Sequence, residues 1–212
     1  MRRTAHGVIV MAVVGIGLIA LPLVAQTQVS VLFRQLQSRK TTDSAVKQLL
    51  RLGRSDPKAR SYLAIHLPRL IAEDYRPQPY SDFGERWPKI RQQWANAIWL
   101  AGDLKLVEAI PVLAKQIDVR YTPQLNLDEN NPATIALCHI GDPAVPSVRR
   151  ILDDGNGEQR LFALNVLEGM DSPKAMAALR DYEKSGKDQW VVDRVRVYLD
   201  NRPAVELGPD CR

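Results

Sequence analysis

The chain has 212 residues, of which 45% are hydrophobic and 25% are charged, a composition that excludes wholesale disorder. The length allows one substantial domain, or a repeat array that follows a targeting segment. The formal net charge of +5 includes Arg2 and Arg3 at the N-terminus, and the remaining basic excess is too small to indicate a nucleic-acid partner.

The first 25 residues resemble a secretory signal peptide. Arg2 and Arg3 supply a basic start, and residues 8–25 form an uncharged apolar run. Cleavage after Ala25 is one interpretation. An uncleaved N-terminal membrane anchor is the other, because the run reaches the lower limit for spanning a bilayer; membrane contact would then involve residues 8–25 alone. Both interpretations predict an exported chain, in a periplasmic or extracellular location.

Helical periodicity begins directly after the leader. Apolar residues recur at helical spacing from Val29 to Leu36 and predict a short amphipathic helix within residues 26–42. Thr42 then starts a second helix, which Gly53 is expected to close.

Two longer helices flank the first interruption of this pattern. Pro57 starts one of them, and Pro68 within it predicts either a kink or a break into two helices. Residues 75–86 contain two prolines and a glycine and are expected to form a loop. Trp87 opens the next helix, and Gly102 is expected to end it.

The central unit of the chain consists of two helical runs joined by a tight corner. A helix over residues 104–118 and a loop near 119–131 precede this unit. Asn131 caps the first run, and the corner lies at residues 141–143, with the sequence Gly-Asp-Pro. The second run extends to Leu152.

Other segments repeat the plan of this central unit at intervals of 35 and 31 residues. Three five-residue segments share one pattern: residues 109–113, 144–148 and 175–179. In each segment a small residue and an apolar residue come first, Pro or Ala is third, and a small residue and an apolar residue follow. Upstream of them four apolar positions align, and an arginine stands seven residues before three of the four. The aligned positions are Leu67, Ile98, Leu137 and Leu167, preceded by Arg60, Arg91, Asn130 and Arg160. We expect these arginines to bond carbonyl groups or acids between neighbouring layers.

A helix pair cannot bury its apolar stripe alone, so such pairs stack on their neighbours. The sequence therefore predicts an all-α fold, an α-solenoid over residues 43–200. The last helix, over residues 190–199, is expected to cap the array, and residues 201–212 form a tail.

The segments GDPAVPSVRRIL, DSPKAMAALRDY and GDLKLVEAIPVLAKQ carry a family resemblance. They resemble HEAT repeats, in particular the short HEAT repeats also found in phycobilisome lyases. The resemblance covers about residues 43–200 and implies an armadillo-type superhelix, without implying an activity. The chain departs from the pattern in its two long loops, at Asn130 and in the shortened corner at residues 142–144, so the repeat count stays open.

The two cysteines, Cys138 and Cys211, leave two interpretations open. Export would allow them to form a disulfide, whereas the position of Cys138 on an apolar stripe is equally consistent with a buried thiol. In the tail, Val205 and Leu207 alternate with polar residues. This alternation predicts an extended segment that folds back on the end of the array.

No motif predicts a catalytic, cofactor or metal site. The chain contains no nucleophile elbow, phosphate-binding loop or dinucleotide fingerprint. His66 and His139 have no second histidine at ligand spacing and are expected to be structural. Residues 153–158 have the residue types of a calcium loop without its ligand spacing, and we expect a turn in which Asn156 and Gly157 adopt positive φ.

In HEAT-type pairs the second helices normally line the concave surface, and here they carry charges of both signs. The basic side chains that could bind an acidic protein or peptide are Lys115, Arg149, Arg150, Arg180 and Lys184. A solvated helix face of mixed charge is the alternative meaning of this pattern. The predicted function is a non-enzymatic interaction scaffold with a protein or peptide partner. A lyase-like or other enzyme-accessory module that holds a small ligand is the alternative.

Overall fold

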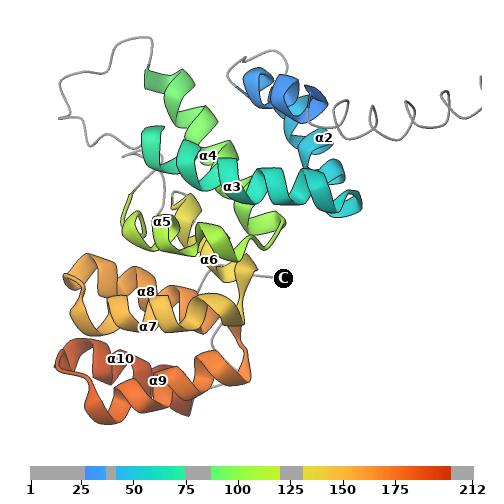
Figure 1. The fold of residues 1–212 in the computed structure, drawn as a ribbon. Coiled ribbons are helices and arrows are strands. Elements are labelled where there is room, and N and C mark those ends of the chain that lie inside the picture. Colours follow the sequence, from blue (N-terminus) through green and yellow to red (C-terminus); the bar gives the residue numbers. More distant parts are fainter. Residues whose placement is uncertain (1–26, 37–41, 75–86, 120–130, 202–212) are drawn as a thin grey trace, which may run out of the picture. The chain divides into compact units, whose positions relative to one another are not determined.

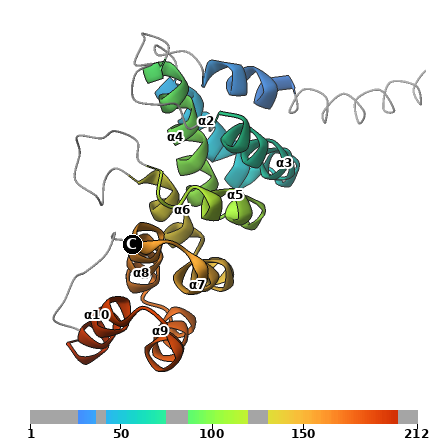
Figure 2. The ribbon, with the colours of Figure 1, turned by 90° about the vertical axis from the view of Figure 1, so that its left-hand side faces the viewer.

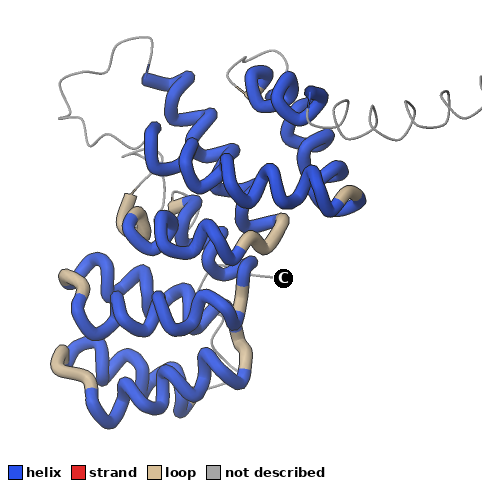
Figure 3. Tube along the Cα trace, viewed as in Figure 1, coloured by secondary structure: helices blue, strands red, loops and turns tan. Residues whose placement is uncertain are grey.

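The structure is a computed structural model that describes residues 27–36, 42–74, 87–119 and 131–201. These residues form helices and turns, and the described ranges contain no strand (Figure 3). The predicted all-α class is therefore confirmed. The leader, the tail and most of both predicted loops lie outside the described residues, so the expectations for them stay predictions. The chain divides into two compact units, residues 1–63 and 64–212.

The first unit contains a helix at residues 27–35, α2 (Thr42–Ser55) and the beginning of α3 (Pro57–Asp74). Its buried apolar residues are Val29, Leu32, Leu36, Ala45, Leu49, Ala59 and Leu63. Gly53 does not close α2, as expected from the sequence, but is buried within it. The helix continues because the backbone N–H of Asp56 still donates to the carbonyl oxygen of Leu52, at 2.8 Å, and the chain turns only before Pro57.

The proline within α3 does not divide the helix. α3 continues through Pro68 to Asp74, so the predicted alternative of two separate helices is wrong. A proline inside a helix removes one backbone hydrogen bond. The adjacent residues Leu67 and Ile71 are fully buried, and this packing of one helix face offsets that loss.

In the second unit the helices form two rows (Figures 1 and 2). The first-helix row consists of α4 (Trp87–Asp103), α6 (Pro132–Ile140), α8 (Gly157–Met170) and α10 (Gln189–Asp200). The second-helix row consists of α5 (Ile110–Lys115), α7 (Val145–Asp154) and α9 (Pro173–Ser185). Each helix packs on the next one of its own row, and α7 and α9 also pack on α8. Two short 3-10 turns, η1 (Val107–Ala109) and η2 (Asp142–Ala144), precede α5 and α7.

Side-chain caps and one glycine define the ends of these helices. The side chain of Asn131 accepts a hydrogen bond from the backbone N–H of Thr134, at 3.2 Å, as expected for a cap. Gly141 ends α6 at φ 80°, in the region that favours glycine, and so forms the corner before η2. The expected positive φ at residues 156–157 is wrong: Asn156 has φ −72° and forms a reciprocal capping box with Gln159.

The predicted helix over residues 104–118 is shorter in the structure. Lys105 adopts a left-handed conformation with φ 51°, and α5 begins only at Ile110. This turn buries both Leu104 and Leu106, two positions that one helix would direct to different sides. Pro111 then lies in the first turn of α5, where its missing N–H is tolerated.

α4 and α6 approach each other closely at two small residues. A Cβ atom added to Gly102 would lie 2.7 Å from the Cα atom of Ala136. Larger side chains would therefore separate these two helices. Close to this contact lie fully buried residues of the aligned repeat position, Ile98 in α4 and Leu137 in α6.

Truncation of an aligned core residue should destabilise the chain strongly. Leu137 and Leu167 are fully buried, so changing either to Ala should lower the free energy of unfolding by roughly 2–5 kcal/mol, through lost burial and a residual cavity. Lys184→Ala, at an exposed position, is the control. Guanidinium unfolding measures both effects, and equal shifts for Leu167→Ala and Lys184→Ala would show that the packing register is wrong.

Candidate functional site

The five candidate residues of the partner-binding surface all belong to the second-helix row. Lys115 ends α5, Arg149 and Arg150 lie in α7, and Arg180 and Lys184 lie in α9. Because α7 packs on both α5 and α9, the candidates come from three consecutive packed helices. Four of them are exposed, whereas the side chain of Arg149 is only 16% exposed.

Arg149 is bound to neighbouring side chains. Its Nη2 atom donates to Oδ2 of Asp181 in α9, at 3.0 Å, and its Nη1 atom forms an ion pair with Asp153. The guanidinium carbon also lies 5.0 Å from the ring centroid of Tyr182, within the range of a cation–π interaction. Arg149 therefore links α7 to α9. The exposed candidates are Lys115, Arg150, Arg180 and Lys184.

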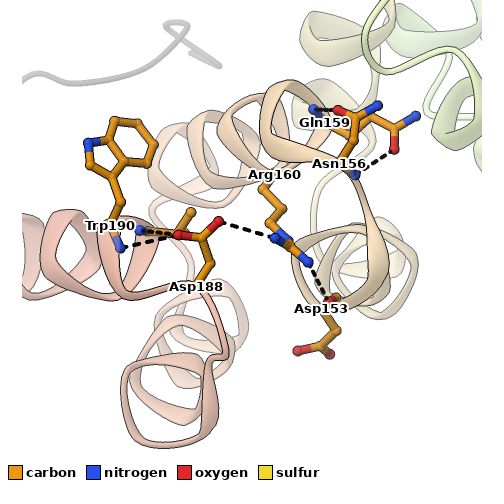
Figure 4. Close-up of polar contacts among 7 residues, drawn as sticks. Asp153, Asn156, Gln159, Arg160, Asp188 and Trp190 are labelled. Carbon is orange, nitrogen blue, oxygen red and sulfur yellow. Dashed lines mark hydrogen bonds and ion pairs between the residues drawn. The ribbon is translucent and has the colours of Figure 1, made fainter.

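A second arginine, Arg160, links the ends of three helices (Figure 4). Its Nη1 atom donates to Oδ2 of Asp188, at 3.1 Å, and its Nη2 atom to the carbonyl oxygen of Asp153, at 3.3 Å. The other carboxylate oxygen of Asp188 caps α10 by accepting from the backbone N–H of Trp190. Arg160 thus bonds both a carbonyl and an acid of neighbouring helices, as its repeat position predicts. This arrangement explains its place in the repeat without an anion ligand.

Two polar side chains of α8 are buried. Glu168 is 3% exposed and Asn165 is 8% exposed. Neither carboxylate oxygen of Glu168 has a hydrogen-bond partner, and the same holds for Oδ1 of Asn165 and Nε of Arg194. Burial raises the pKa of Glu168 to about 7, although the positive charge of Arg194 acts in the opposite direction. The hydroxyl group of Tyr198 donates to the backbone carbonyl of Glu168, at 3.0 Å, so α10 contacts α8 directly at this residue.

The two histidines of the described chain lie on different helices. His139 in α6 places its Nδ1 atom 3.1 Å from Oδ1 of Asp103, which ends α4. His66 lies half-buried in α3. Among the described residues, no group of three or more His, Cys, Asp or Glu side chains is arranged to hold a metal ion.

Cys138 lies between α6 and α8. It is 3% exposed, and its Sγ atom is 4.0 Å from the carbonyl oxygen of Val166. Cys138 is disulfide-bonded, whereas Cys211, the one other cysteine of the sequence, lies outside the described residues. Within the part of the chain that is described, no helix is both long and apolar enough to span a bilayer.

Sequence reasoning did not find the buried Glu168 or the exposed Trp190. Trp190, in the first turn of α10, is 58% exposed. The signal for Glu168 was present: it and Asn165 are the two polar residues in the run LFALNVLE. An acid at the end of such an apolar run is expected either to be buried or to mark an exposed edge, and only the neighbouring helices decide between the two.

In comparisons with known proteins, no family model, curated protein or solved structure matches this chain.

Replacing Glu168 should change how stability depends on pH. Its carboxyl group binds a proton more tightly in the folded chain, with a pKa of about 7, than at the ordinary value of 4.5. The proton bound to this carboxyl group therefore makes its full contribution to the free energy of unfolding below pH 4.5. That contribution falls as the pH rises towards 7, by roughly 3 kcal/mol in total. Glu168→Gln should lack this fall and be more stable than the wild type at pH 8.

The measurement is denaturant unfolding at several pH values between 4 and 8. Glu108→Gln, which alters an exposed glutamate, is the matched control and should keep the pH profile of the wild type. If Glu168→Gln also keeps that profile, the carboxyl group of Glu168 is not desolvated in solution.

Proposed function

We propose that this chain is an exported, non-enzymatic interaction scaffold, in which a HEAT-like α-solenoid presents its second-helix row to an acidic protein or peptide. One observation carries the proposal: three consecutive packed helices supply exposed basic side chains to a single row. These are Lys115, Arg150, Arg180 and Lys184. The two-row packing of the second unit supports the solenoid, because stacked helix pairs bury their apolar stripes in this way.

The spacing of the charges supports an extended ligand. Lys115 and Arg150 occupy equivalent repeat positions, and the equivalent position of the next layer is Asp181, so exposed positive charge recurs at this position in the first two layers of the row. Packed helices lie about 8–10 Å apart. Side chains on one face of an extended peptide recur about every 7 Å, so acidic residues at every second position would meet successive layers.

The acids of this row restrict what can bind. Asp181 is 73% exposed and pairs with Arg149, so the surface is of mixed charge. A partner must therefore place its acidic groups towards the exposed lysines and arginines and keep them away from Asp181, since like charges in contact destabilise a complex. Such patterning favours a specific partner over general attraction to any anionic surface.

Export is supported by two features of the chain. The leader has the basic start and apolar run of a secretory signal or an N-terminal anchor. The disulfide-bonded state of Cys138 fits an oxidising compartment, because disulfides persist outside the cytoplasm and are rare within it.

Charge reversal of the second-helix row should abolish partner binding. A variant with Lys115, Arg150, Arg180 and Lys184 changed to Glu is compared with the wild type for proteins retained from an envelope extract. A control variant reverses four exposed basic residues of the first unit instead: Lys47, Arg51, Arg54 and Lys58. The wild type and the control variant should retain the same protein, with at least about tenfold weaker binding by the row variant.

Two outcomes would contradict this proposal. Equal retention by the two reversal variants would place the binding surface elsewhere. Small molecules that raise the melting temperature, without any retained protein, would favour the alternative of a lyase-like or other enzyme-accessory module.

Export is tested separately from binding. Residues 1–30, fused to a reporter that folds only outside the cytoplasm, should give active reporter, and changing Arg2 and Arg3 to Glu should reduce the activity. Mass spectrometry of the native protein then distinguishes a new N-terminus at Gln26 from an uncleaved anchor. Reporter activity confined to the cytoplasm would exclude export.

A further inference from the structure

One side of the first-helix row carries polar atoms that are buried without hydrogen-bond partners. Asn165 and Glu168, three residues apart on α8, lie on the same side of that helix. Cys138 and Glu168 each follow an aligned repeat position, Leu137 in α6 and Leu167 in α8. The disulfide-bonded cysteine and the unpaired oxygens therefore lie on the same side of two packed helices.

We propose that the C-terminal segment, residues 202–212, docks along this side of α10, α8 and α6, and that a disulfide between Cys211 and Cys138 holds it there. Cys138 is disulfide-bonded, and the chain has one other cysteine. The segment is thus the occupant that the chain itself provides. This inference does not depend on the proposed partner-binding function.

The chemistry of the row suits a peptide. Buried polar groups are nearly always hydrogen-bonded, and here three acceptor oxygens, on Asn165 and Glu168, are unpaired. An extended peptide carries backbone N–H donors at regular intervals. Such donors can form hydrogen bonds with the unpaired oxygens of Asn165 and Glu168.

The outer part of the row complements the side chains of the segment. Trp190 and Val197 on α10 are 58% and 53% exposed and stand seven residues apart, hence on one side of the helix. Arg194 lies between them, with its guanidinium carbon 6.0 Å from the ring centroid of Trp190. Alternate side chains of an extended segment point to the same side, so Val205 and Leu207 supply apolar groups that can both face α10.

The length of the segment is sufficient for this path. From the end of α10 at Asp200, eleven residues lead to Cys211, and an extended chain of that length spans at most about 36–40 Å. α10 packs on α8, and α8 packs on α6, so Cys138 is two helix spacings away, or about 16–20 Å. The bridge therefore needs no opening of the helix packing.

Peptide mapping under non-reducing conditions tests the bridge, on full-length protein purified from an oxidising compartment. The expected result is one linked pair of peptides, containing Cys138 and Cys211 of the same monomer. Two free thiols, or a bridge that joins two chains, would overturn the proposal.

Docking of the segment is measured by cleavage after Glu206 with a glutamate-specific protease. In the oxidised wild type this cleavage should be at least about tenfold slower than in Cys211→Ser, because a bound segment must detach before it is cut. Carbodiimide labelling of Glu168 should rise several-fold in the same variant. Cys211→Ser alters no residue of the described helices, so it should still fold.

A second variant separates docking from the tether. Val205→Ser combined with Leu207→Ser keeps both cysteines and should keep the bridge, yet be cleaved faster after Glu206 than the wild type. Equal cleavage rates in the wild type and both variants, or equal labelling of Glu168 in the wild type and Cys211→Ser, would show that the segment does not cover this row.

Discussion

The burial of α8 is the constraint on which the second unit depends. Seven consecutive residues of this helix, from Phe162 to Glu168, are buried, because α6, α7, α9 and α10 all pack on it. A helix surrounded in this way has no wide polar face, and its residues 161–167 are apolar except for Asn165. Glu168 stands at the end of this buried run, and its burial raises the pKa of its carboxyl group to about 7.

Directional bonds at the helix ends fix the register of neighbouring helices in addition to their apolar packing. Arg160 bonds the end of α7 and the start of α10 from the start of α8, and a planar guanidinium group satisfies two such acceptors in one geometry only. At the contact of α4 with α6, the close approach of Gly102 to Ala136 has a comparable effect through shape. The layers are therefore held in register by a few positions, while many apolar residues supply the burial.

The sequence contains local information about helices, and the predictions succeed where local chemistry decides. The cap at Asn131, the corner at Gly141 and the buried repeat positions could all be predicted in this way. The environment of a side chain could not. Arg149 and Arg150 are identical neighbours, yet only Arg149 is bound, because Asp181 and Tyr182 approach it from a helix about 30 residues further along the chain. The burial of Glu168 also depends on helices distant in sequence, and the apolar run before it does not decide between a buried and an exposed acid.

The two rows of the second unit differ in how they carry charge. The second-helix row keeps four basic side chains in water, where an exposed charge adds little to stability and can be exchanged without disturbing the core. The first-helix row buries a carboxyl group, an amide and a disulfide-bonded cysteine, and unpaired polar groups in such places are costly. A change of one of these four exposed side chains should therefore have little effect on folding, whereas a change of the buried polar groups of the first-helix row acts on stability first.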